Sequence, residues 1–418
     1  MSSVPAAPAV ADGATRCGVD AVDIARIERL LAETPAGELT KLFSPQELAD
    51  AGDGPGRASS LAARFAAKEA CVKLFPRDAA LGAVGPTDFS VTRDAYGAPV
   101  VELNESAQIA LGRNRLRSIS VSLTHDRTQA SAVALGQPER ATPSWPARLL
   151  YRLLPFRRKV VLDNLRRVYG DVVDEAEIER LAQAHYGHLG RLLWEFLWFP
   201  WLSRSRRLAM VRVENLESLL DAHALGRGVL VLTGHFGNFE VATAAGLAQF
   251  PQADGRFHFV RRPIRPEWLD RLVTRRFRKA GFGVLPKRGG LEAILDRLAA
   301  GDLVVFPFDQ HASRKDGVLA EFFGHPAGTF RSLAVIALAT GAPVVPASSW
   351  READGQHVLR FEDRLMPIEH PDTNEAIRRN TRAYNRALER MIVRRPEQWW
   401  WVHRRWKPWP ERASRSAT

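Results

Sequence analysis

The chain has 418 residues, which is enough for two or three domains. Apolar residues make up 45% and charged residues 25% of it, which excludes collagen-like, low-complexity and wholly disordered proteins. Its two cysteines, Cys17 and Cys71, exclude a disulfide framework, and no Cys/His group has zinc spacing, so we expect a reducing compartment. We find no apolar run of about 18 residues and no secretory leader, so we expect no membrane-spanning helix.

The net charge of +12 is unevenly spread along the chain. Residues 1–140 carry 15 basic and 17 acidic residues, whereas the rest carry 44 basic and 30 acidic residues and all 11 tryptophans. This shift in composition predicts two unlike domains. The basic, tryptophan-rich half favours an anionic partner, either a membrane surface or a nucleic acid.

Composition also predicts the domain boundaries. The Ala/Pro-rich residues 1–15 and the last residues, 412–418, are expected to be disordered tails. A proline-containing linker is expected at 137–147. It would separate a first domain at 16–136 from a second at 148–411.

The first half begins with GVDAVDIARIERLL, which predicts a short strand running into a helix. SLAARFAAKEACVKLF is rich in helix-forming residues. DFSVTRDAYGAPVVEL predicts a strand, a turn and a strand, and SISVSLTHD predicts an alternating strand that ends at His125, with a further strand after it. These elements predict an α+β domain.

The second half opens with basic helical segments over 148–190, followed by the aromatic stretch LLWEFLWFPWL. GVLVLTGHFGNFEVATAAGLA then predicts a buried strand, a tight loop and a helix. Two more apolar strands, DLVVFPFDQ and APVVPASSW, flank another helix. Strands alternating with helices predict an α/β domain with a central mixed sheet flanked by helices.

The first group of candidate site residues is Asp20, Glu69 and Lys73. Two carboxylates from separate elements can hold Mg²⁺ together with substrate phosphates. Lys73 follows Glu69 by four residues and so shares its helix face. The same spacing also fits an ordinary surface ion pair on a helix.

The motifs that surround these residues, and the order in which they follow one another, are more specific than the spacing alone. GVD with IARI, the Phe43–Glu47 FxxxE pattern, FAAKEA, YGAPVVEL and VSLTHD follow one another over about residues 17–136. This series resembles the holo-acyl-carrier-protein synthase type of 4′-phosphopantetheinyl transferase. The family transfers phosphopantetheine from coenzyme A to a serine of acyl carrier protein, uses Mg²⁺, and usually forms trimers.

The resemblance implies a role for each matching residue. Asp20 and Glu69 match the metal ligands, and Lys73 matches a lysine that contacts a coenzyme A phosphate. His125 matches the histidine of an SxSHD segment, in which this chain has Thr124 in place of serine.

The second group of candidate site residues is a His–Glu pair in GHFGNFE, His235 and Glu240. The glycines predict that His235 lies in a loop and Glu240 in the first helical turn, so that the carboxylate can fold back onto the imidazole. Such a carboxylate would make the histidine a general base. The alternative is a glutamate that is simply favoured by the helix dipole.

The surrounding sequence again resembles a known family. GHFGNFE, FVRRP, AGFGVLP, FPFDQ, ATGAPVVP and PEQWWWVHRRWK follow one another over about residues 148–410. They resemble the lauroyl/myristoyl-type acyltransferases of lipid A synthesis, within the lysophospholipid acyltransferase group.

That resemblance implies that His235 takes a proton from an acceptor hydroxyl that attacks an acyl thioester, and that Glu240 orients the histidine. Arg262 matches an arginine that could contact an acceptor phosphate or the transition-state charge. Asp309 and Gln310 match an Asp-Gln pair, to which we assign no chemistry. The chain has no GxSxG, so no serine nucleophile is expected.

Family members usually start with a membrane anchor, whereas here the first domain occupies that position. Contact with an anionic membrane would then come from the basic amphipathic residues 146–159, the aromatic residues 192–202 and the WWWVHRRWKPW segment. We therefore expect a cytoplasmic protein that is peripheral on the inner face of the plasma membrane. Residues Trp399–Trp401 fit a buried core equally well.

We predict a bifunctional transferase. Its first activity attaches phosphopantetheine to acyl carrier protein, and its second transfers an acyl chain, preferably from acyl carrier protein, to a lipid or glycolipid hydroxyl. The alternative is an acyltransferase whose first domain only docks acyl carrier protein without catalysis. A nucleic-acid partner is not expected, because the chain carries no nucleic-acid-binding motif.

Overall fold

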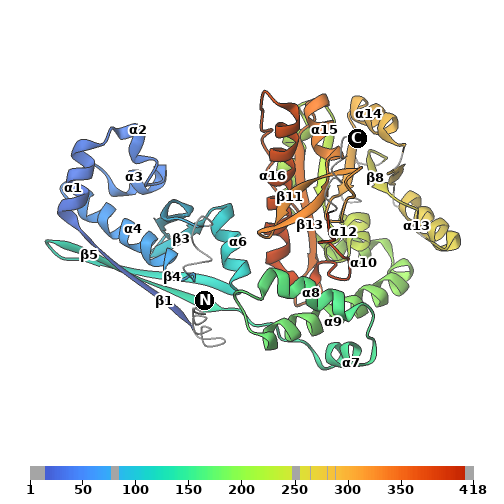
Figure 1. The fold of residues 1–418 in the computed structure, drawn as a ribbon, viewed down its shortest axis with the longest axis horizontal. Helices are drawn as coiled ribbons and strands as arrows, with labels where there is room; N and C mark the ends of the chain where they lie inside the picture. The colour runs from blue at the N-terminus through green and yellow to red at the C-terminus, as the bar shows by residue number, and fades with distance from the viewer. Residues whose placement is uncertain are drawn as a thin grey trace, which may run out of the picture. The chain divides into compact units, whose positions relative to one another are not determined.

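A computed structural model describes residues 15–76, 84–246, 255–263, 265–279, 281–287 and 289–409. Apart from Thr15, the tails predicted at both ends lie outside the described residues. The chain forms two compact units, Met1–Thr142 with Arg166–Glu179, and Pro143–Leu165 with Arg180–Thr418. Figure 1 colours the first of these segments from blue to cyan.

The first unit combines helices with small antiparallel sheets. Its elements are β1 (Arg16–Asp23), α1 (Ile24–Glu33), α2 (Ala36–Leu39), α3 (Pro45–Ala51), α4 (Arg57–Val72), η1 (Pro86–Asp88), β2 (Phe89–Arg93), β3 (Pro99–Leu103), α6 (Glu105–Arg113), β4 (Leu116–His125) and β5 (Gln129–Pro138). A three-stranded antiparallel sheet has the order β1-β5-β4, and β2 pairs with β3. The predicted α+β fold is confirmed.

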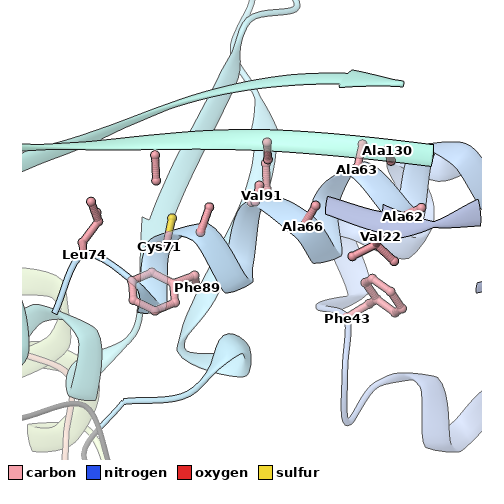
Figure 2. Close-up of a cluster of buried hydrophobic side chains, with 14 of the residues drawn as sticks. Val22, Phe43, Ala62, Ala63, Ala66, Cys71, Leu74, Phe89, Val91 and Ala130 are labelled. Carbon is pink, nitrogen blue, oxygen red and sulfur yellow. The ribbon is translucent and has the colours of Figure 1, made fainter. Parts of the chain in front are cut away.

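Helix α4 forms the centre of the first unit's core. Its buried face is rich in alanine, with Ala62, Ala66 and Ala70 fully enclosed. Figure 2 shows alanines of this helix in one apolar cluster with Val22 of β1 and Ala130 of β5. Because alanine side chains are small, the helix can lie close to the sheet, and this places residues of α4 beside β1.

The second unit is built around a larger sheet. Its elements are α7 (Trp145–Leu153), α8 (Arg158–Tyr169), α9 (Glu175–Trp198), η2 (Phe199–Trp201), α10 (Arg204–Ala209), β6 (Val211–Glu214), α11 (Leu216–His223), β7 (Val229–Thr233), α12 (Phe239–Gly246), β8 (Phe257–Arg261), α13 (Glu267–Lys279), β9 (Gly283–Pro286), α14 (Leu291–Ala299), β10 (Leu303–Pro307), β11 (Gly317–Phe322), β12 (His325–Phe330), α15 (Ser332–Thr340), β13 (Val344–Arg351), β14 (His357–Phe361), α16 (Thr373–Arg394) and η5 (Pro396–Gln398). Helices α8 and α9 contribute Arg166–Glu179 to the first unit.

The seven strands have the order β6-β14-β13-β7-β10-β8-β9. Strand β13 runs antiparallel to β14, and every other neighbouring pair is parallel. All eight residues of β13 are buried, as in a strand that is covered on both faces. The predicted α/β fold with a central mixed sheet flanked by helices is confirmed.

Two further features bear on the predictions. Helix α7 begins at Trp145, inside the predicted linker, because Pro146 fits the first turn of a helix. Among the helices of the described residues, none combines the length and the apolar character that a membrane crossing requires.

Candidate active sites

The first candidate site lies where β1 meets α4. The Lys73 Nζ donates to Asp20 Oδ1 at 2.7 Å and to the carbonyl of Val19 at 2.9 Å. Glu69 lies one turn before Lys73 on the same helix. Burial and the neighbouring charge of Asp20 raise the pKa of Glu69, against the opposing effect of Lys73. The structure therefore brings together three of the four residues that the sequence analysis selected in the first domain.

The glycine of the GVD motif makes this meeting possible. A Cβ atom on Gly18 would lie 2.0 Å from the carbonyl oxygen of Ala70. Any side chain would force β1 away from α4 and would separate Asp20 from Glu69. In the GVD motif, Gly18 therefore allows β1 to pack closely on α4, and Asp20 follows two residues later.

The pair of carboxylates fits a divalent cation. Magnesium is commonly held by one or two carboxylates, several waters and substrate phosphates. Burial, and after it the charge of Asp20, raise the pKa of Glu69, and a bound cation would favour the ionised form of both carboxylates. Within the described ranges, no group of three or more histidine, cysteine or acidic side chains forms a denser metal site.

His125 does not join this cluster. It is exposed at the end of β4, which is separated from β1 by β5, and its Nδ1 lies 3.4 Å from the carbonyl of Asp126.

Two other motif residues have a structural role. Glu47 and Lys68 form a fully buried ion pair, with Oε2 and Nζ 2.6 Å apart. Glu47 also accepts hydrogen bonds from the backbone N–H groups of Ser44 and Val91. These contacts tie α3, α4 and β2 together, so part of the motif series encodes the fold that positions the site.

The second candidate site lies at the carboxyl ends of four adjacent parallel strands, β7, β10, β8 and β9. Each strand is followed within two residues by a polar side chain, in that order His235, Asp309, Arg262 and Lys287. Ligands of open α/β sheets bind outside the carboxyl ends of the strands. The chain therefore places four functional groups along the edge where chemistry is expected.

His235 and Asp309 form a directly bonded pair. The His235 Nδ1 lies 2.9 Å from Asp309 Oδ1. The other carboxylate oxygen accepts hydrogen bonds from the His235 backbone N–H and from Trp399 Nε1, both at 2.8 Å. The side chain of Asp309 is 3% exposed and that of His235 is 29% exposed. Asp309 is thus fixed from three directions, while the imidazole remains accessible.

The electrostatics agree with this geometry. Burial alone would lower the pKa of His235, but the charge of Asp309 and the hydrogen bond to it raise that pKa overall. Burial would raise the pKa of Asp309, yet His235 and Trp399 hold it well below its usual range. An ionised Asp309 that accepts the Nδ1 proton leaves Nε2 of a neutral His235 as the basic atom.

The sequence analysis assigned Glu240, not Asp309, as the partner of His235. The side chain of Glu240 lies outside the described residues, so its pairing stays a prediction. Asp309 came from the FPFDQ motif without a chemical role. Its role could not be seen in the sequence, because the contact depends on β10 lying next to β7.

The loop that carries His235 is held between two other segments. Gly237 has a positive φ of 48°, and a Cβ there would lie 2.6 Å from the carbonyl oxygen of Ser349. The backbone N–H of Gly237 donates to the carbonyl of Gln398, and that of Trp400 donates to the carbonyl of His235. The second glycine of GHFGN therefore permits a close approach of the loop to β13.

Two of the three tryptophans in the run, Trp399 and Trp401, lie inside the second unit and not on a membrane surface, whereas Trp400 is half-buried. Trp399 is 2% exposed and Trp401 is 0% exposed. Trp399 donates to Asp309, and Trp401 Nε1 donates to the carbonyl of Pro396. The expectation of membrane contact is wrong for these two residues, since both indole N–H groups have buried partners, and the buried-core alternative is confirmed.

A buried polar network supports the same loop from α9. Glu195 accepts hydrogen bonds from Asn238 Nδ2 at 2.8 Å and from the Arg351 guanidinium at 2.6 and 2.7 Å. Burial alone would raise the pKa of Glu195, but His357, Arg351 and Asn238 lower it to about 2. The ion pair therefore links the GHFGN loop to α9 and β13, and apart from the asparagine of the motif nothing in the sequence pointed to it.

Two known protein families match successive parts of the chain. Residues 143–408 match the bacterial lipid A biosynthesis acyltransferases, and residues 16–134 match the 4′-phosphopantetheinyl transferase superfamily. The lipid A biosynthesis palmitoleoyltransferase of Escherichia coli (strain K12) is 32% identical over 239 residues, 56% of this chain and 74% of that protein.

Two further proteins resemble the first domain. The holo-[acyl-carrier-protein] synthase of Syntrophus aciditrophicus (strain SB) is 36% identical over 118 residues, 28% of this chain and 91% of that protein. A solved Helicobacter pylori holo-[acyl-carrier-protein] synthase in complex with coenzyme A is 27% identical, with a TM-score of 0.25 over 29% of this chain and 99% of that one. The chain therefore belongs to the bacterial lipid A biosynthesis acyltransferase family and carries, ahead of that domain, a 4′-phosphopantetheinyl transferase domain of the holo-acyl-carrier-protein synthase type.

Proposed function

We propose that the first unit transfers 4′-phosphopantetheine from coenzyme A to a serine of acyl carrier protein. The convergence of Asp20, Glu69 and Lys73 supports this proposal. Asp20 and Glu69 would hold Mg²⁺, which supplies positive charge at the diphosphate. Lys73 is half exposed and can exchange Asp20 for a phosphate oxygen, so that it neutralises charge as the serine oxygen attacks phosphorus and the adenosine bisphosphate leaves.

The remaining assignments of this unit are proposals as well. An active enzyme is favoured over a docking module that has lost catalysis, because all three side chains are present and meet. The outward face of the β1-β5-β4 sheet exposes Val19, Val133 and Leu135, which fits a trimer formed through this unit. A trimer would also give the exposed His125 a route to a neighbouring subunit's site.

The second unit, we infer, passes an acyl chain from a thioester to a hydroxyl of a membrane lipid or glycolipid. The observation that carries this proposal is the pairing of His235 with the buried Asp309. The His235 Nε2 takes the hydroxyl proton while the acceptor oxygen attacks the thioester carbonyl, and the departing thiolate takes the proton back. Asp309 stabilises the imidazolium that forms between these steps. Arg262 is exposed at the same edge and would bind an acceptor phosphate.

The two units also support proposals for the acyl donor and for the place in the cell where the protein acts. Acyl carrier protein is the preferred donor carrier, because the first unit would make the arm from which the acyl chain hangs. An exposed apolar surface on α7, on η2 and at the end of α9, here called the α7–α9 surface, would bind the inner face of the plasma membrane from the cytoplasm. It consists of Trp145, Leu149, Leu153, Leu154, Phe156, Leu193, Trp194, Leu197 and Trp201.

Two of the elements that carry this surface, α7 and α9, pack directly on each other. A Cβ on Gly187 would lie 2.6 Å from the Ala147 Cβ, and one on Gly190 would lie 2.6 Å from a methyl group of Leu150. Exposed arginines accompany the apolar side chains on α7 and α10, namely Arg148, Arg152, Arg204 and Arg206. Apolar and cationic groups together favour binding to an anionic bilayer.

The test is acyl transfer by the purified full chain to a total lipid extract. Labelled acyl-carrier-protein and acyl-coenzyme-A donors are compared, with His235→Ala as the control. A product formed only by the unmodified protein would support the proposal, rank the two donors and yield a lipid whose mass identifies the acceptor. Equal product with and without His235, or no product from either donor, would count against the acyltransferase mechanism.

A further inference from the structure

The second unit contains a cavity of about 130 Å³ beside its candidate site. It lies among β8, β10, β12, α14 and α15, and most of its lining is apolar: Val260, Ile294, Phe306, Phe308, Phe330 and Ile336. A cavity of about 150 Å³ is large enough for a benzene molecule, so this one has room for a few methylene groups. Phe308 directly precedes Asp309 in the chain, and another lining residue, Lys287, lies within electrostatic reach of both Asp309 and His235.

Lys287 is the charged side chain in this lining. It directly follows β9, and its Nζ lies 3.6 Å from the centre of the Phe330 ring. Burial and the charge of Arg262 lower the pKa of Lys287 to about 8, against the opposing effect of Asp309 and Asp316. Its charge in turn lowers the pKa of His235. The ammonium group therefore lies where the apolar cavity meets the acid–base pair.

We propose that Lys287 binds the carbonyl oxygen of the acyl thioester while the first methylene groups of the acyl chain occupy this cavity. This inference rests on the acyltransferase function proposed above and names the residue that faces the reacting carbonyl.

The role follows from where charge develops in the reaction. When the acceptor oxygen adds to the thioester carbon, its proton moves to His235 and negative charge develops on the carbonyl oxygen. Lys287 keeps its proton and donates a hydrogen bond to that oxygen until the carbon–sulfur bond breaks. A fixed cation in apolar surroundings stabilises such charge far better than it could in water.

The experiment compares Lys287→Met, Lys287→Arg and the control Lys279→Met, since Lys279 is exposed at the end of α13. The kcat and KM for the acyl donor and for the lipid acceptor are measured between pH 6 and pH 10. We expect Lys287→Met to lower kcat about 10²–10³-fold, as the loss of one oxyanion contact does, and Lys279→Met to leave it unchanged. We also expect the unmodified protein to lose activity above about pH 8, and Lys287→Arg to abolish that alkaline decrease because arginine does not deprotonate.

Several outcomes would overturn the proposal. An unchanged kcat in Lys287→Met, or an alkaline decrease that persists in Lys287→Arg, would show that the ammonium does not act on the thioester. A change confined to the acceptor KM would assign Lys287 to an acceptor phosphate instead.

A binding measurement separates this inference from the proposed function. The probe is a pantetheine ketone that keeps the carbonyl and the acyl chain but replaces sulfur with carbon. Lys287→Met, and Ile336→Trp, which fills the cavity, should each weaken its binding about tenfold or more. Unchanged binding in both variants contradicts the inference whether or not the protein turns over, whereas loss of turnover with intact probe binding contradicts only the proposed function.

Discussion

At the scale of single residues, the proposed role of Asp309 is to hold His235 in one tautomer through its contact with Nδ1. Asp309→Asn should lower kcat for acyl transfer about 10²–10⁴-fold while the protein stays folded, since an amide can present the wrong group to Nδ1. The raised pKa of His235 means that activity should fall as pH drops through that pKa. Removing the carboxylate lowers this pKa, so the residual activity of the variant should persist to lower pH.

Glu240→Gln is the matched comparison, because the sequence analysis assigned the pairing role to that residue. The pH–rate profiles of both variants are measured side by side. A large loss in Glu240→Gln together with near-normal activity in Asp309→Asn would restore the His–Glu pair and refute the His–Asp pair.

The candidate residues that the structure brings together are those set close to one another by one element or by one short motif. Glu69 and Lys73 share a turn of α4, and Asp20 is brought to them by a glycine within its own motif. Asp309 received no chemical role from the sequence, and Lys287 was not selected. Asp309 contacts His235, and Lys287 comes within its electrostatic reach, only through the lateral order of parallel strands. Hydrophobic patterns predict that such strands exist, but not which of them are neighbours.

At the scale of elements, α9 buries two histidines whose protonation opposes folding. His185 is fully buried and its pKa is lowered to about 4, chiefly by burial, and the pKa of His188 is also lowered well below its usual value. Below about pH 6.5 the unfolded chain binds protons at these positions, whereas the folded chain does not until the pH is far lower. Stability therefore rises with pH in this window and decreases as the pH falls.

Each buried histidine should reduce the free energy of unfolding by about 2 kcal/mol between pH 7 and pH 5. Denaturant unfolding of the full chain at both pH values measures this loss, with His185→Gln as the comparison. The variant should lose less stability than the unmodified protein over the same interval. An equal or larger loss in His185→Gln would mean that other groups cause the acid sensitivity.

The α7–α9 surface gives a second prediction at this scale. Leu153→Glu should weaken binding to anionic vesicles about tenfold or more, because it places a carboxylate in an apolar, basic surface. Leu319→Glu is the control, because Leu319 is also an exposed leucine but lies on β11, outside the α7–α9 surface. Vesicle sedimentation at low and high salt measures both variants, and equal binding by the two would refute the assignment.

The strands that the sequence analysis named are present in the structure, but it named none for β6, β8, β9, β11, β12 or β14. The Trp399–Trp401 run was ambiguous because consecutive residues in an irregular segment face different ways. The indole N–H groups of Trp399 and Trp401 donate to buried acceptors, and only the structure identifies these acceptors.

At the scale of the whole molecule, each unit has its own core and its own candidate site. Asp20→Ala should abolish phosphopantetheine transfer and spare acyl transfer, and His235→Ala should do the reverse. Both reactions are measured on the same purified full-length preparations, with acyl carrier protein and a lipid extract as acceptors. Loss of both activities in either variant would contradict two independent sites.

The full chain is required for such tests because the first unit does not end where its first segment ends. Glu177 belongs to the first unit and is buried beside Arg115, with which it forms an ion pair at 3.3 Å. It also accepts a hydrogen bond from the backbone N–H of Ala141. A protein cut at residue 142 would lack Glu177 and would leave Arg115 with Glu139 as its remaining acidic partner, so the first unit would lose part of its buried ion-pair network.

Trp399 follows every residue of the first unit in the chain, so the second candidate site is completed later than the first during synthesis. Ribosomes synthesise the chain from its N-terminus. All residues assigned to the first unit have left the ribosome once Glu179 has emerged. The His235–Asp309 pair, in contrast, waits for an indole donor 90 positions after Asp309 and for backbone partners at Gln398 and Trp400. A nascent chain stalled before that point would therefore contain Asp20, Glu69 and Lys73 in a unit whose residues are all present, while the His235–Asp309 pair would still lack its indole donor.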